Sequence, residues 1–78
     1  MNWQEHIHSD EKILLGKPII KGTRISVELI LELMGKGWTE KMILESYPSL
    51  TAENLKAMFW YLHECIQQEM FFPLRNSA

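Results

Sequence analysis

The sequence predicts a mainly α-helical fold in which three helices follow a short β element. Two observations lead to this prediction. Serine or threonine stands directly before each of three apolar stretches with helical spacing, as expected of a residue that caps a helix N-terminus. Before the first of these stretches, two short apolar runs flank Gly16 and Lys17, which is typical of a small hairpin.

The first helix is predicted to begin after Ser26, whose hydroxyl can accept a hydrogen bond from the free amides of the first turn. A core-facing stripe at positions i, i+3, i+4 and i+7 follows, made of Val27, Ile30, Leu31 and Met34. Gly35 and Gly37 then supply the permissive backbone that ends a helix.

The second helix is predicted to be short and to begin after Thr39. Trp38, just before the cap, is placed to pack on Ile43 as a hydrophobic staple. The helix is expected to end at Tyr47, because Pro48 constrains the preceding residue and offers no amide donor.

The third helix repeats this pattern, with Thr51 as the cap and Leu50 placed to pack on Leu55. It is predicted to reach about Glu69, before Pro73 forbids its continuation. Its apolar positions at helical spacing are Leu55, Met58, Phe59, Leu62 and Ile66.

The β element is predicted over residues 12–25, with strands near Ile13–Leu15 and Pro18–Lys21. A two-stranded ribbon is marginal in water. It must therefore pack on the helices, or pair with the same segment of a second chain in a strand-swapped dimer. Residues 1–11 are mostly polar and unpatterned except for Trp3 and Ile7, and are expected to form a loosely held arm.

The 78 residues are expected to form one domain, with a helical core over 26–70 and a tail over 71–78. The 46% of apolar and 23% of charged residues are ordinary globular values. A chain of this length is marginally stable unless a partner helps. Because no apolar run reaches the roughly 20 residues of a membrane span and no signal peptide is visible, a cytoplasmic location is expected. The single cysteine, Cys65, is expected to be a reduced apolar side chain.

Charge is unevenly distributed along the chain. The net charge is −2, yet the stretch from Lys12 to Val27 holds four basic residues and no acidic one, and so carries +4. The other residues hold four basic and ten acidic groups, which gives −6. Because lysine and arginine supply most of the affinity for phosphates, the basic stretch is a candidate DNA contact. The alternative is a solvated hairpin with exposed lysines.

The short helix ending at Tyr47, a turn of about three or four residues and the helix from Thr51 have the layout of a helix-turn-helix. In DNA-binding proteins with this layout the second helix can lie in the major groove. Many small helical proteins contain such a corner for packing alone, so both interpretations stay open.

Most of the chain also resembles a known family. The resemblance is carried by the run GKPIIKGTRISVELILELMGKGWTEKMILESYPSLT, from Gly16 to Thr51. This run is similar to domain-of-unknown-function family 433, small bacterial and archaeal proteins regarded as VapB-like antitoxins. The likeness covers about Ile7 to Leu62 and implies a homeodomain-like helix-turn-helix bundle that assembles as a dimer.

The resemblance implies a function as well. Such antitoxins typically block a PIN-like ribonuclease toxin and repress their own promoter. We therefore expect a non-enzymatic antitoxin of a type II toxin–antitoxin system, acting as a homodimer that binds its toxin and its promoter DNA. The alternative is a protein-interaction or structural dimer module that does not bind DNA. The negative net charge favours this alternative, as does Glu53, which would face phosphates from the first turn of the third helix.

If DNA is bound, Asn54 is the preferred base reader, because its amide can pair with adenine through two hydrogen bonds. The full set of candidate DNA contacts is Lys17, Lys21, Thr23, Arg24, Ser49, Thr51, Asn54 and Lys56. The alternative is that these residues have structural roles. Thr51 would then act as a helix cap alone, and Arg24 would pair with an acidic residue such as Glu28.

The candidate contacts with a toxin or a second protomer are apolar and lie late in the chain: Trp60, Tyr61, Met70, Phe71, Phe72 and Leu74. The chain departs from the family by following Ala57 with four bulky residues, which indicates a thicker core or a larger contact surface. The alternative is a C-terminus folded back to complete an undersized core.

No cofactor, metal or catalytic residues are expected. His63 and Cys65 are two residues apart on a helix and so point to different faces, while His6 and His8 lie in the predicted arm without further ligands nearby. Phosphate-binding glycine loops, catalytic triads and paired carboxylates converging in a cleft are not seen in the sequence.

Overall fold

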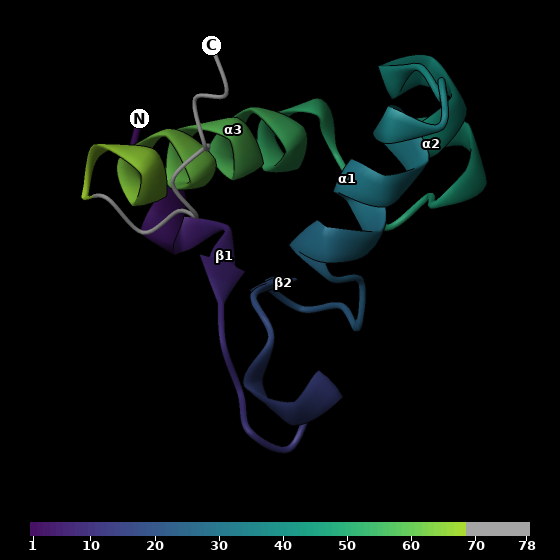
Figure 1. The fold of residues 1–78 in the computed structure, drawn as a ribbon. Coiled ribbons are helices and arrows are strands. Elements are labelled where there is room, and N and C mark those ends of the chain that lie inside the picture. The colour runs from purple at the N-terminus through teal and green to yellow at the C-terminus, as the bar shows by residue number, and fades with distance from the viewer. Residues whose placement is uncertain (69–78) are drawn as a thin grey trace, which may run out of the picture.

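The computed structural model describes residues 1–68 of the chain and is mainly helical (Figure 1). Its elements, in chain order, are the 3-10 helix η1 (Trp3–Glu5), strand β1 (Ile7–His8), the 3-10 helix η2 (Leu14–Gly16), strand β2 (Ile19–Ile20), and helices α1 (Val27–Gly35), α2 (Glu40–Ser46) and α3 (Ala52–Gln67). The predicted fold class, three helices after a short N-terminal two-stranded sheet, is confirmed. Within residues 1–68, no helix is both long and apolar enough to cross a bilayer.

All three helix starts were predicted correctly. The hydroxyl of Ser26 accepts a hydrogen bond from the backbone amide of Leu29 at 3.0 Å. Those of Thr39 and Thr51 accept from the amides three residues later, at 3.2 and 3.1 Å. Each cap satisfies an amide that the helix itself leaves without an acceptor, and this is why short polar residues define these boundaries.

Helix α1 ends as the glycine pattern predicts. Gly37 has a left-handed φ of 99°, and its amide donates to the carbonyl of Met34 at 3.0 Å. The amide of Trp38 donates to the carbonyl of Leu33, also at 3.0 Å. These two bonds form a Schellman motif, in which a glycine reverses the chain and satisfies two terminal carbonyls.

The sheet forms, but its first strand lies elsewhere than predicted. β1 pairs antiparallel with β2 within the same chain, with Ile7 opposite Ile20 and His8 opposite Ile19. The expected strand at Ile13–Leu15 is therefore wrong, and most of that segment is the 3-10 turn η2. The physical reason is burial: the side chains of Ile7 and Ile20 enter the core, whereas those of η2 do not.

The prediction of a loose arm over residues 1–11 is also wrong. Ile7 is only 3% exposed, and η1 packs against α3, which crosses above it in Figure 1. The indole Nε1 of Trp3 donates to a carboxylate oxygen of Glu64 at 3.0 Å. The ring of Trp3 meets Tyr61 edge to face, with centroids 4.9 Å apart. An amphipathic aromatic side chain thus ties the N-terminal segment to the last helix.

The core lies between the sheet and the three helices. It consists of Ile7, Ile20, Val27, Ile30, Ile43, Leu50, Leu55, Ala57 and Met58. The buried face of α3 does not coincide with the apolar stripe predicted from the sequence. Ala57, outside the stripe, is fully buried, whereas Phe59 and Ile66, within it, are 49% and 61% exposed. The reason is that α3 packs on η1 and β1 as well as on α2, so its core contacts spread toward Ala57 and Tyr61.

Candidate functional site

Helices α2 and α3 meet at the predicted proline corner and do not run on as one helix. The α2 helix ends at Ser46, and α3 begins at Ala52. Between them, the amide of Leu50 donates to the carbonyl of Tyr47 at 2.9 Å, and the Leu50 side chain is buried. The corner is therefore anchored in the core, and the five residues 47–51 join the two helices for which a helix-turn-helix was predicted.

Asn54, the preferred base reader, is engaged inside the molecule. Its Oδ1 accepts from the backbone amide of Thr51 at 2.9 Å, which completes a reciprocal capping box. Its Nδ2 donates to Nδ1 of His6 at 3.1 Å, and the side chain is half-buried. Pairing with adenine uses both of these amide atoms, so base reading by Asn54 would compete with both contacts.

The two threonines among the candidate contacts also have structural partners. Thr51 caps α3. The hydroxyl of Thr23 donates to the carbonyl of Ile20 at 2.8 Å and accepts from the amide of Ile25 at 3.0 Å. Together with the left-handed Gly22, whose φ is 83°, Thr23 closes the turn that leads from β2 to α1.

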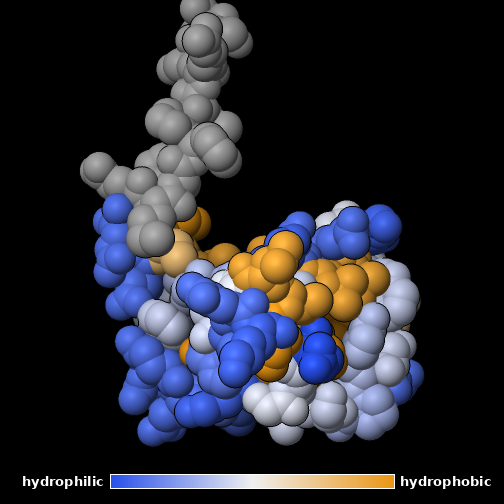
Figure 2. All heavy atoms as spheres, turned by 90° about the horizontal axis from the view of Figure 1, so that it is seen from below, coloured by the Kyte–Doolittle hydropathy of each residue, from blue (hydrophilic) through white to orange (hydrophobic). Residues whose placement is uncertain are grey.

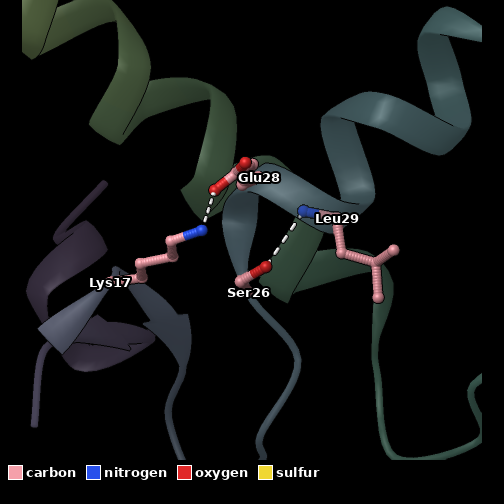
Figure 3. A network of polar contacts seen from close by, with 4 residues as sticks. All are labelled: Lys17, Ser26, Glu28 and Leu29. Carbon is pink, nitrogen blue, oxygen red and sulfur yellow. Dashed lines mark hydrogen bonds and ion pairs between the residues drawn. The ribbon is translucent and has the colours of Figure 1, made fainter. Parts of the chain in front are cut away.

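Two of the candidate lysines form ion pairs. Lys17 Nζ lies 2.7 Å from Glu28 Oε2 on the first turn of α1, beside the Ser26 cap (Figure 3). Glu28, the acidic partner suggested for Arg24, is therefore paired with Lys17 instead. Lys56 Nζ lies 3.8 Å from Glu53 Oε1, one turn back on α3. All four side chains are more than half exposed, so each pair contributes little stability and could exchange for another partner.

Three candidates remain exposed without any of these engagements: Lys21, Arg24 and Ser49. Lys21 and Arg24 lie at the two ends of the tight turn Lys21–Arg24, here called the cationic turn. Within residues 1–68 neither side chain has an ion-pair partner. Of the predicted DNA contacts, the cationic turn is therefore the part whose charges face water unneutralised.

The predicted partner contacts divide into three groups. Met70, Phe71, Phe72 and Leu74 lie outside the described residues. Tyr61 is half-buried under Trp3, and burial, with a smaller effect of its hydrogen bond to Cys65, raises the pKa of its phenol. Trp60 is 47% exposed, and its contact with a partner stays a prediction.

Trp60 belongs to a larger surface, the α3 apolar face, formed by Phe59, Trp60, His63 and Ile66. The rings of Trp60 and His63 meet edge to face with centroids 5.4 Å apart. With Lys56 and Phe59 they line a shallow hollow of about 290 Å³. Phe59 and Ile66 were assigned to the core from their spacing. The structure instead buries Ala57, which places the core on the other side of α3, and the apolar spacing alone could not show this.

The histidine, cysteine and carboxylate side chains of residues 1–68 are dispersed. Across residues 1–68, no three histidine, cysteine, aspartate or glutamate side chains converge on a point where an ion could bind. His6 instead contacts Asn54, and Cys65 is half-buried on α3. The two candidate surfaces are the cationic turn and the α3 apolar face.

Comparison with known proteins identifies relatives of unestablished function. Residues 7–62 match the model of a family described as protein of unknown function, DUF433. The uncharacterized protein y4eO of Sinorhizobium fredii is 34% identical over 53 residues, which are 68% of this chain and 24% of that protein. The crystal structure of a DUF433 member protein from Anabaena variabilis superposes with a TM-score of 0.75 at 32% identity, covering 83% of this chain and 64% of that one. This chain thus spans about a quarter of the first relative and less than two thirds of the second. The family match, the shared fold and the matching sequence together show that this chain belongs to the DUF433 family.

Proposed function

We propose that this protein is a non-enzymatic, cytoplasmic antitoxin of a type II toxin–antitoxin pair, which binds and blocks a PIN-like ribonuclease toxin through the α3 apolar face. The observation that carries the proposal is the exposure of three large apolar side chains on one helix: Phe59 at 49%, Trp60 at 47% and Ile66 at 61%. The family resemblance supplies the class of partner.

A protein partner fits this surface better than DNA does. Aromatic side chains are enriched where proteins associate, and a helix that presents them at i, i+1, i+4 and i+7 can lie in an apolar groove. Phe59, Trp60, His63 and Ile66 have this spacing. The first turn of α3, by contrast, carries Glu53 and an Asn54 whose amide is already bonded on both sides. We therefore propose that α3 contacts the toxin and does not enter the major groove of DNA.

Co-expression with the product of the adjacent gene, which the proposal expects to be a PIN-like nuclease, tests this role. We expect the toxin to copurify with the wild-type chain and its toxicity to be suppressed. The double variant Phe59→Gln/Trp60→Gln should lose both effects, because it removes the apolar anchors and keeps good helix formers. Met42→Gln, at a 42% exposed position on α2, is the matched control and should behave as wild type. Retention of the toxin by the α3 double variant would refute the proposal.

Promoter binding is a second candidate function, favoured by the unneutralised cationic turn. A dimer would present two copies of Lys21 and Arg24, enough to hold phosphates on either side of a groove. We expect Lys21→Ala/Arg24→Ala to weaken binding to the promoter and to lower the salt dependence by about one counterion per lost phosphate contact. Lys41→Ala/Lys36→Ala is the charge-matched control. If promoter binding is absent, or equal in both variants, the protein acts on the toxin alone.

A further inference from the structure

The 3-10 turn η2 holds an exposed leucine on a strained backbone. Leu14 and Leu15 have φ of 50° and 57°, in the left-handed region that residues other than glycine adopt at a cost. Leu15 is 94% exposed, the most open of the large apolar side chains among residues 1–68. The turn is nevertheless braced, since the amides of Gly16 and Lys17 donate to the carbonyls of Ile13 and Leu14 at 3.1 and 3.2 Å.

A hollow of about 420 Å³ lies next to this leucine. Leu14, Leu15 and Leu29 form its apolar wall, and Lys17, Ser26, Glu28 and Glu32 complete its lining. Figure 2 views the molecule from the side where η2 lies and shows hydrophobic residues gathered in one patch beside hydrophilic ones. A cavity of roughly 150 Å³ already admits benzene, so the hollow can accept a leucine side chain.

We propose that this surface joins two copies of the chain, with Leu15 of each protomer seated in the hollow of the other. The same patch then carries both the projecting group and its receptor, which is the condition for a two-fold interface. The occupant that this surface fits is therefore a second copy of the chain. Burial of Leu15 in the dimer would offset the cost of its left-handed backbone. This interface lies away from the α3 apolar face and does not depend on the antitoxin role.

The charges around the hollow are self-complementary as well. Lys17 is bound to Glu28, while Glu32, one helical turn further along α1, has no ion pair within residues 1–68. Both glutamates line the same hollow. A two-fold axis through the patch brings Lys17 of one protomer toward the partner's Glu32, and the reciprocal pair forms on the other side. Because the patch carries both a lysine and glutamates, it complements a second copy of itself better than a partner that is only acidic or only basic.

Sedimentation of the full chain over a concentration series tests the interface. Wild type is expected to form dimers, with a melting temperature that rises with concentration. Leu15→Asn keeps a residue that tolerates the left-handed region and removes the projecting group, so it should fold as a monomer. Its dimer dissociation constant should rise at least about tenfold, and its melting temperature should no longer depend on concentration. Phe59→Gln, on the α3 apolar face, should still dimerise.

Charge reversal supplies an independent readout. Lys17→Glu and Glu32→Lys should each weaken the dimer, and combining them should restore part of it, because the pair across the axis is re-formed with its signs exchanged while the contact of position 17 with Glu28 of the same chain becomes repulsive. A wild-type monomer at all concentrations, open polymers, or a Leu15→Asn variant that dimerises like wild type would each overturn the proposal. Loss of toxin binding in Phe59→Gln with the dimer intact would bear on the proposed function alone.

Discussion

At the scale of single residues, Asn54 joins the start of α3 to the N-terminal segment. Its Oδ1 completes the capping box of α3, and its Nδ2 reaches His6, 48 residues earlier in the sequence. The spacing Thr51-x-x-Asn54 is that of a capping box with asparagine in place of the usual glutamate or glutamine. The sequence therefore contained the signal for this role, but the partner His6 could not be inferred, because it comes from a segment without helical or strand periodicity.

Replacing Asn54 should affect stability before it affects any ligand. Asn54→Ala removes one capping contact and one contact with His6, and we expect a loss of about 1–2 kcal/mol in the free energy of unfolding. Asn54→Asp keeps an acceptor for the Thr51 amide and should lose less. Urea denaturation measures both values. A stable Asn54→Ala variant that fails to bind promoter DNA would instead favour base reading.

Tyr61 makes stability depend on pH in the alkaline range. Burial raises the pKa of its phenol above the ordinary 10.0, so the folded state favours the protonated form. The stability contributed by this group is present below pH 10 and is lost as the pH rises through the raised pKa. Tyr61→Phe cannot ionise and should lack this alkaline loss. Unfolding of the two proteins, followed at neutral and at alkaline pH, checks the difference.

At the scale of elements, the helices were predictable because each boundary has a local chemical cause. Serine, threonine, glycine and proline act within four residues of the boundary that they set, as Ser26 and Gly37 show. The strands had no such signal. Two-residue strands are too short to show alternation, and β1 is recognisable only through the burial of Ile7 against distant segments. The left-handed leucines of η2 were not predictable, since the preference of leucine lies elsewhere.

The two glycines that end α1 should respond oppositely to alanine. Gly35 is helical and has open space where a Cβ would stand, so Gly35→Ala should stabilise the protein by up to about 1 kcal/mol. Gly37 has φ of 99°, and Gly37→Ala should destabilise it by about 1 kcal/mol or more. Thermal unfolding of the pair measures both signs. Equal effects would show that the Schellman motif does not set the boundary.

At the scale of the whole molecule, the N-terminal segment is part of the core. Trp3 and Ile7 pack against elements from the other end of the sequence, and β1 is the partner of β2. Deleting residues 1–8 should therefore abolish cooperative unfolding, whereas His8→Ala, at an exposed position, should leave it intact. Near-ultraviolet circular dichroism and urea titration distinguish these results. A deletion variant that unfolds cooperatively would restore the interpretation of residues 1–11 as an arm.

The bond between Trp3 and Glu64 spans 61 positions of the chain, which constrains the moment at which the protein can fold. Synthesis proceeds from the N-terminus at about 5–20 residues per second, so Trp3 and Ile7 leave the ribosome seconds before α3 does. Throughout that interval they have no helix to cover them. Nascent chains are thus open to chaperones and proteases until α3 has been made, and a ribosome that stalls before Glu64 releases a product that cannot close its core.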